Sequence, residues 1–386
     1  MLEQITDAAS KLFEALTHSG GRHLTPVAVL QVNGRPFGSL TMSRIISVQL
    51  ADNRGFEADE LTIELSDHDG ALEIPPQEAL IKCWLGYQET GVVYKGEYKM
   101  AEFTHSGAPD KLSITARAAD LAATLDQQEN KSWHKQTLYQ IVEAIAKKHA
   151  YPYKISADYQ ATAIHHIDQT NESDAAFLVR LAKEFDTIPT VKDGRLLFVR
   201  AGLALTATGK AMPPLIITRK AGDNHRFSVA DRDAYTGVVA YWHDKKAAEK
   251  KVVKLKRRKK KTTTTTAATT TTDTTTPAAV VKENELLIGS DENVKHLRHI
   301  YANQKNAERA AKAHWQRLQR GVAEFSMTLA VGRPELITEL PVTVRGIKPQ
   351  IDEAKWISTK IVHNVTSDNG YTSHVEFEVK IDEVPE

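Results

Sequence analysis

Two acidic residues at the start of one predicted helix are the first candidates for chemistry in this chain. Glu172 and Asp174 lie on either side of Ser173, and a facing pair of carboxylates is what glycoside hydrolysis requires. Acidic residues also gather at helix starts, where they cap free N–H groups and face the positive end of the helix dipole. Because no second carboxylate can be placed opposite them, capping is the favoured interpretation, and a glycosidase is the alternative.

Patterns that would bind a metal or a phosphate are incomplete. His165-His166 are adjacent and would point to opposite faces of a strand, while His296 and His299 would share a helix face without a carboxylate set. Gly209-Lys210-Ala211 lacks the hydroxyl that a phosphate loop needs after its lysine. The sequence therefore predicts no enzyme site, no metal and no cofactor.

A basic run lies between positions 250 and 261, where nine Lys and Arg residues occur with no acid. Subtracting these nine charges from the net charge of +1 leaves −8 for the rest of the chain. The run is compatible with a solvated disordered loop, with binding to a polyanion or a partner, or with a nuclear localisation signal. The candidate contact residues are Lys254, Lys256, Arg257, Arg258, Lys259, Lys260 and Lys261.

Length and composition limit the class of protein. A chain of 386 residues, 41% hydrophobic and 26% charged, indicates a globular protein with more than one core. Its single cysteine, Cys83, rules out an internal disulfide bond. No run of about 18 apolar residues and no secretory signal appears, so we expect no membrane anchor.

Short alternating runs predict a mainly β fold with an α+β insert and a long helix. We expect a small antiparallel barrel over 26–125, an α+β insert over 130–205, and a second barrel from 210–245 and 322–382. Helices capped by Thr137 and Ser173 and a hairpin around Asp193-Gly194 belong to the insert. The remaining expectations are an amphipathic helix over 1–20, a basic and Thr-rich disordered loop over 250–280, and a helix over 290–320.

A hairpin pattern occurs twice. Glu102-Phe103-Thr104-His105 precedes a turn and an alternating strand over 112–116, and Lys360-Ile361-Val362-His363 precedes a similar pair over 372–377. The repetition suggests two barrels of similar plan separated by the insert.

Many short motifs resemble, in order, the late control protein D family of contractile-tailed phages. The resemblance runs from Pro26 to Val379 and rests on turns and strand edges. It is carried by 59–67, Asp69-Gly70, Ile74-Pro75, Leu85-Gly86-Tyr87, Gly96-Glu97-Tyr98, Ser132-Trp133, 171–174, Phe177-Leu178, 180–182, 193–196, 315–321, 332–336, Ile351-Asp352 and Trp356.

The resemblance implies a tail hub in the virion baseplate, similar in plan to the base of VgrG proteins. Such a hub is expected to be a homotrimer, made and assembled in the bacterial host cytoplasm. Its two tube-like barrels per chain would form a six-unit ring for DNA passage. Its expected partners are the tail tube protein, the spike protein, the tape measure protein and other baseplate proteins, with transient contact to passing DNA. We expect an acidic inner wall with the basic run outside it. The alternatives are a cell-wall hydrolase carried on the baseplate and a non-specific nucleic-acid-binding protein acting through the basic run.

Overall fold

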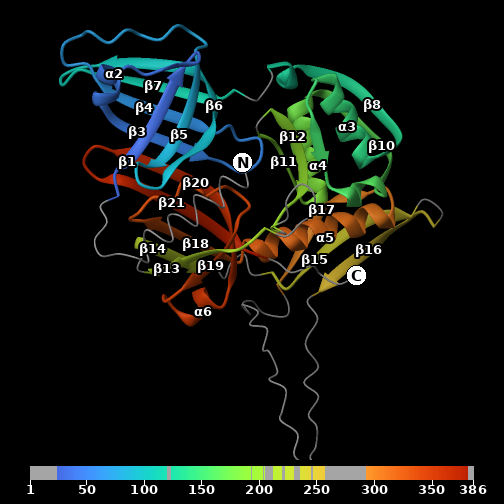
Figure 1. The fold of residues 1–386 in the computed structure, drawn as a ribbon. Helices are drawn as coiled ribbons and strands as arrows, with labels where there is room; N and C mark the ends of the chain where they lie inside the picture. The colour runs from blue at the N-terminus through green and yellow to red at the C-terminus, as the bar shows by residue number, and fades with distance from the viewer. Residues whose placement is uncertain are drawn as a thin grey trace, which may run out of the picture. The chain divides into compact units, whose positions relative to one another are not determined.

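The computed structural model describes residues 24–119, 123–192, 194–202, 204, 212–219, 222–229, 235–244, 247–256 and 293–380. The chain divides into two compact units, Met1–Val229 with Ala323–Glu386 and Ala230–Val322 (Figure 1). The helix expected over 1–20 and the residues from 257 to 292 lie outside the described residues. No helix in the described ranges is long and apolar enough to cross a membrane.

A 13-stranded sheet forms most of the first unit and consists of two blocks. Block 1 contains β1 (Pro26–Val32), β2 (Arg35–Pro36), β3 (Ile45–Asp52), β4 (Glu60–Ser66), β5 (Leu80–Tyr87), β6 (Gly91–Ser106) and β7 (Lys111–Ala118), with the short helix α2 (Ser39–Ser43). Block 2 contains β13 (Leu215–Thr218), β14 (Gly222–Val229), β18 (Ala323–Leu329), β19 (Pro341–Arg345), β20 (Lys355–Thr366) and β21 (Gly370–Val379), with α6 (Pro349–Asp352).

Six strands in each block follow the same path. Block 1 has the order β3-β4-β7-β6, and block 2 has the order β14-β18-β21-β20. In each block the fifth strand, β5 or β19, pairs with the beginning of the long hairpin strand, and the sixth, β1 or β13, pairs with the fifth. The blocks differ in that β1 is antiparallel to β5 whereas β13 is parallel to β19. The fold is therefore a duplication.

The repeated hairpin pattern aligns residue by residue across the two blocks. Following the ladders from hairpin to hairpin places Phe103 in the position of Ile361 and His105 in that of His363. The register shifts between Met100 and Glu102 in β6, and at the matching place in β20. The duplication that the sequence echo suggested is confirmed in topology.

The two blocks are joined into one continuous sheet. Strand β20 pairs antiparallel with β3, from Ile361 opposite Asp52 to Thr366 opposite Ser47. An edge strand with unpaired backbone groups readily accepts another strand, and here each block supplies one such edge to the other. The mainly β character that the sequence predicted is confirmed.

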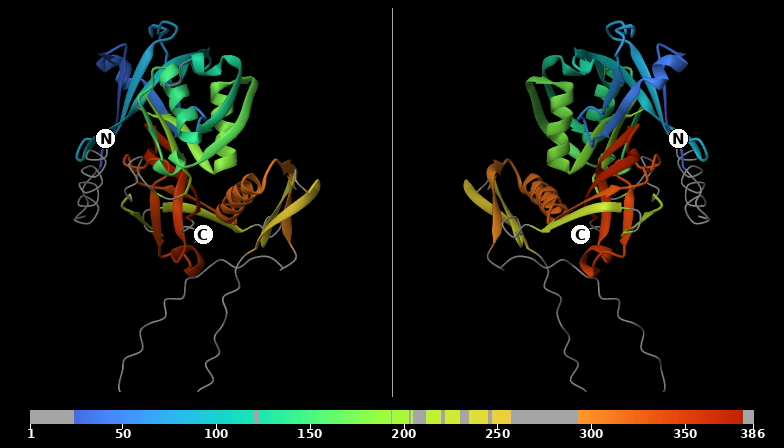
Figure 2. Two further views of the ribbon diagram at one scale, coloured as in Figure 1. Left: turned by 90° about the vertical axis from the view of Figure 1, so that its right-hand side faces the viewer. Right: turned by 90° about the vertical axis from the view of Figure 1, so that its left-hand side faces the viewer.

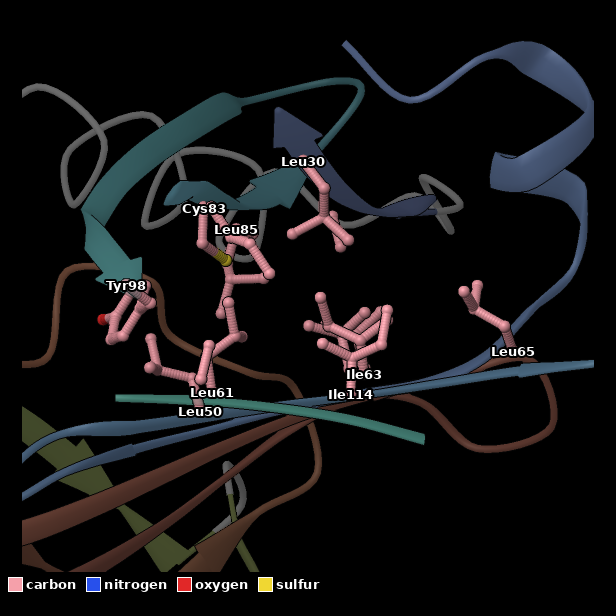
Figure 3. Packing of buried hydrophobic residues seen from close by; sticks show 14 of the residues in the cluster. Leu30, Leu50, Leu61, Ile63, Leu65, Cys83, Leu85, Tyr98 and Ile114 are labelled. Carbon is pink, nitrogen blue, oxygen red and sulfur yellow. The ribbon is translucent and has the colours of Figure 1, made fainter. Parts of the chain in front are cut away.

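The core of block 1 lies between two layers of strands. Leu50, Leu61 and Ile114 extend from β3, β4 and β7, and Leu30 and Cys83 extend toward them from β1 and β5 (Figure 3). The 16-residue β6 serves both layers, because its first part pairs with β5 and its second part with β7. The bulge between the two parts gives the bend that this change of layer needs.

A buried irregular segment, Gly332 to Leu336, joins the blocks. Tyr87 Oη donates to the Gly332 carbonyl over 2.9 Å, and Lys95 Nζ donates to the Leu336 carbonyl over 3.0 Å. Burial lowers the pKa of Lys95 to about 8. Arg333 Nε lies 2.6 Å from Glu335 Oε1. These bonds satisfy backbone and charged groups that would otherwise be buried without partners.

The insert has an α+β fold and lies between the two blocks in the sequence. It contains β8 (Gln128–Thr137), α3 (Leu138–Lys148), β9 (Tyr153–Ile155), β10 (Ala163–Ser173), α4 (Asp174–Phe185), β11 (Thr187–Lys192) and β12 (Arg195–Arg200), with short turns η1 (Ala123–Asp126) and η2 (Ala157–Gln160). Thr137 forms a capping box and Ser173 caps α4, as the sequence predicted. The two helices pack with residues of the strands β8 to β12 in a single apolar core.

Asp174 ties the two insert helices together. Its carboxylate is buried and lies 2.8 Å from Lys148 Nζ and 2.8 Å from His149 Nε2 at the end of α3, and it accepts from Gln169 Nε2. Burial alone would raise the pKa of Asp174, but these hydrogen bonds outweigh it and lower the pKa. The carboxylate therefore has a structural role.

The second unit differs from three element boundaries that the sequence predicted. Its sheet has the order β16-β15-β17 and consists of β15 (Gly237–Asp244), β16 (Glu249–Lys256) and β17 (Val294–Tyr301), followed by α5 (Gln304–Arg320). The strand expected in the second barrel before residue 245 is β15 of this sheet. The helix expected from 290 begins only at Gln304, because β17 precedes it. The loop expected from 250 begins with a strand, because Val253 and Leu255 alternate with lysines and pack beneath α5.

We predict that Gly332→Ala destabilises the first unit. A Cβ at this position would overlap the buried ring of Tyr371, and the surrounding backbone cannot move without breaking the junction. Overpacking of this kind costs about 1–3 kcal/mol. Gly38→Ala is the control, since nothing lies within 4 Å of its added Cβ. Urea unfolding of both variants measures the effect, and equal midpoints would refute the role given to this junction.

Asp174→Asn should destabilise the chain by about 2 kcal/mol at pH 7, because it removes charge-assisted hydrogen bonds from a buried site. A lowered carboxyl pKa gives stability that is present above the unfolded-state pKa and lost as the pH falls through the folded one. The difference from the unmodified chain should therefore shrink in acid. Asp158→Asn, which alters an exposed carboxylate 3.9 Å from Arg200, should stay within about 0.5 kcal/mol. A pH-independent difference would contradict this assignment.

Candidate subunit interface

Several strand edges in the first unit have no partner among the described strands, and two of them lie on β6 and β14 of the 13-stranded sheet. The second half of β6, from Ala101 to Ser106, pairs only with β7, and β14 pairs only with β18. Every residue from Ala101 to Ser106 is exposed, as are Asn224, His225 and Arg226 in β14. Unpaired edges of this length are sites where another strand can add.

Apolar side chains mark both edges. Phe103 in β6 is 39% exposed, an unusual position for a phenylalanine on a strand. Phe227 in β14 is half-buried, and its ring lies at about a right angle to the Trp356 ring, with ring centroids 6.2 Å apart. A hollow of about 650 Å³ lies beside the β6 edge and is lined by Met100, Ala101, Glu102, Phe103 and residues of β7. The β6 edge is therefore an exposed, partly apolar and concave surface.

The two edges correspond to the joint within the chain. The β3–β4 and β14–β18 ladders each have a register shift at the corresponding place. Aligning the two shifts puts Asn224 in the position of Ser47 and Phe227 in that of Leu50. Strand β14 is therefore the block 2 counterpart of β3, and β6 is the block 1 counterpart of β20. Within the chain β3 pairs with β20, whereas their counterparts β14 and β6 do not pair with each other.

The carboxylates that suggested catalysis do not form a facing pair. Glu172 is held by Arg180, whose Nη2 lies 2.8 Å from Glu172 Oε2, and Asp174 is held by the α3 end as described above. Both are engaged in ion pairs, so neither is available as the base or acid of a hydrolase in this conformation.

The histidine candidates differ from their expected placement. His296 and His299 lie on β17 and not on a helix, because the helix begins later. His166 stacks on His134, with ring centroids 4.5 Å apart, and its Nε2 lies 3.0 Å from Asp168. Among the described residues no group of three or more His, Cys, Asp or Glu could hold a metal ion.

The basic run is divided. Lys254 lies on β16 and is exposed, and Lys256 ends the same strand. The other candidates, Arg257, Arg258, Lys259, Lys260 and Lys261, lie outside the described residues. Sequence reasoning missed the free edges of β6 and β14. The repeat of 102–105 at 360–363 was the available signal: the second copy pairs with β3, and the first copy has no such partner among the described strands.

Known proteins resemble this chain over most of its length. The family described as "Phage tail baseplate hub (GPD)" matches residues 61–369. A probable baseplate hub protein of Escherichia phage 186 is 42% identical over 381 residues, covering 97% of this chain and 98% of the relative. The corresponding protein of Escherichia phage P2 is 43% identical over 380 residues, with the same coverage.

Solved structures share the fold at low identity. The 43 kDa tail protein of prophage MuSo2 from Shewanella oneidensis has a TM-score of 0.60 at 14% identity, covering 91% of this chain and 97% of its own. A chain of the Francisella PdpA-VgrG complex has a TM-score of 0.52 at 10% identity, covering 97% of this chain and 62% of its own. The relation to VgrG proteins that the motifs implied is therefore a shared fold.

The resemblance to the late control protein D family is confirmed by the extent of these matches. The similarity covers nearly the whole chain, and it includes both blocks of the duplicated sheet. This chain belongs to the phage tail baseplate hub family, a structural component of the virion tail.

Proposed function

We propose that three copies of this chain form a ring in which β14 of one copy pairs with the second half of β6 in the next. The ring is the tail hub that joins the tail tube to the central spike. The observation that carries the proposal is the duplicated topology, in which β3 and β20 are joined while their counterparts β14 and β6 are free.

The internal joint gives the register of the proposed contact. In that joint Asp52 faces Ile361 and Ala51 faces Val362. The corresponding pairs between copies are Val229 with Phe103 and Ser228 with Thr104. Phe103 would then meet an apolar side chain on the core side of the sheet, which removes its exposed area from water.

Closure of the ring at three copies is part of the proposal. Repeating the same contact head to tail gives either a ring or an open filament. Three chains with two blocks each present six similar blocks, which suits a hexameric tube on one side and a trimeric spike on the other. The two blocks of each chain are then the tube-like units that the family resemblance implies.

The solvent side of the duplicated sheet suits a conduit for DNA, because its other side is covered by the core. Solvent-side positions of the eight ladder strands carry six carboxylates against five cations: Glu60, Glu64, Glu102, Glu324, Glu376 and Glu378 against Lys99, Lys111, Arg117, Arg226 and Lys360. A wall with more carboxylates than cations repels phosphates, so DNA slides without adhering.

The assembled hub would act in the virion baseplate after assembly in the host cytoplasm. Its partners would be the tube, spike and tape measure proteins and other baseplate proteins, and DNA would touch it only in passage. The residues Arg257 to Lys261 are assigned to a surface outside the bore. Neither a cell-wall hydrolase nor a nucleic-acid-binding protein has a specific observation in its favour, since Glu172 and Asp174 are engaged in ion pairs.

The proposed register predicts a disulfide between copies. Residues directly opposite in an antiparallel pair have Cα atoms about 4.5–5.5 Å apart, which a disulfide spans. The double variant Thr104→Cys with Ser228→Cys should therefore oxidise to a covalent species that stops at three chains on a non-reducing gel. Cys83 is buried and should not interfere.

The control variant shifts the register. Thr104→Cys with Asn224→Cys places the second thiol four residues away, about 13 Å along the strand, and should remain uncrosslinked. Equal crosslinking of both variants, or a ladder of bands beyond three chains, would count against the ring.

The acidic bore predicts a transport defect. Glu64→Lys with Glu376→Lys reverses two carboxylates on the proposed wall, so particles should assemble in normal numbers but deliver DNA several-fold more slowly. Glu73→Lys, which changes an exposed loop residue, is the matched charge control. The rate of DNA release from purified particles is the measurement. Unchanged release from the double variant would show that the wall lies elsewhere.

A further inference from the structure

The sheet of the second unit has one covered face and one open face. Helix α5 covers the first face and packs on Val238, Ala240 and Leu297 through Ala307, Ala311 and Trp315 (Figure 2). Side chains alternate between faces along a strand, so the intervening residues of β15 and β16 point the other way. Val252 and Ile300 on the open side are 45% and 48% exposed.

The open face has three rows that cross the strands. The middle row is apolar and consists of Ile300, Tyr241 and Val252, which are opposite one another in the two ladders. One flanking row contains His243 and Lys250. The other contains the exposed His296 and Lys254, with Val239 between them buried at 4% exposed. Among these eight described residues none carries a carboxylate, so the face is apolar along its centre and basic on both sides.

The spacing of the rows matches an extended chain. Residues i and i+2 of a strand lie about 6.6 Å apart on one face, and the rows of this face are separated by the same step. A second extended segment lying along the strands would therefore present positions i, i+2 and i+4 to the three rows in turn. Charge complementarity requires carboxylates at i and i+4, and the middle row requires an apolar side chain at i+2.

The geometry does not favour nucleic acid. Base stacking needs an accessible aromatic ring face, but Lys250 Nζ lies 4.0 Å from the centre of the Tyr241 ring. The Tyr241 ring also stacks with His296 at 6.1 Å, and Tyr241 Oη lies 2.9 Å from His296 Nδ1. A phosphate backbone would leave the apolar row exposed.

We propose that this open face binds an extended acidic segment of another tail protein, with the pattern acidic-x-apolar-x-acidic. The site is distinct from the strand edges that would close the ring, because those edges belong to the first unit. The inference rests on the proposed hub function only in taking the partner to be a tail protein. Binding of a peptide is measured independently of ring formation, so the two proposals can fail separately.

The test uses the full chain and a fluorescein-labelled peptide, Ser-Glu-Thr-Val-Thr-Glu-Ser. Fluorescence anisotropy should show binding that weakens as salt is added, because the carboxylates face cations. Lys254→Glu should weaken binding at least tenfold, and so should Val252→Asp. Lys305→Glu, the same charge change at an exposed position on α5, should leave binding unchanged.

A rearranged peptide of the same composition, with its two glutamates adjacent, should bind at least tenfold more weakly. Absence of binding to the unmodified chain, equal binding of the two peptides, or equal loss in Lys305→Glu would overturn the proposal. A 12-nucleotide single-stranded DNA that binds better than the peptide and is released by Lys254→Glu would assign the face to nucleic acid instead. Circular dichroism of each variant confirms that the second unit is folded.

Discussion

The backbone ladder between β3 and β20 is the contact on which the arrangement of this protein depends. It joins two copies of one strand topology into a single sheet, although the strands come from opposite ends of the chain. Backbone N–H and C=O groups at a strand edge must be paired or solvated. A duplicated block offers the same two edges twice, and one chain can join only one set internally. The remaining set, on β6 and β14, has no partner among the described strands, and the proposed ring rests on it.

The joint is reinforced by polar contacts that only a folded pair of blocks can supply. Arg54, in the loop after β3, lies 2.5 Å from Glu378 of β21 and also pairs with Glu339. Lys95 and Tyr87 of block 1 bond to the buried segment at Gly332 to Leu336. Paired and hydrogen-bonded charges at a partly buried junction fix geometry more than they add stability. These contacts therefore hold the two blocks in one fixed arrangement.

The insert and the second unit each lie in a connection between strands of the duplicated sheet. The insert follows block 1, and Lys192 at the end of β11 forms ion pairs with Asp52 and Asp59 on either side of the β3–β4 loop. The second unit lies between β14 and β18, a connection that is only Asn53 to Asp59 in block 1. One block therefore has a short loop where its counterpart holds a three-stranded sheet and a helix. The duplicated scaffold can accept such insertions because loop closure costs little more for a longer connection.

The sequence by itself determined the classes of element and the family. Period-2 alternation gave the strands of block 1, Thr137 and Ser173 gave the starts of α3 and α4, and the repeat at 102–105 and 360–363 indicated a duplication. These features are local, and local patterns follow from propensity and capping. The β3–β20 joint and the free edges were decided only by tertiary structure, since pairing joins residues more than 300 positions apart. The same reason explains β16: its lysines indicated a loop, but Val253 and Leu255 become core residues only because α5, far along the chain, covers them.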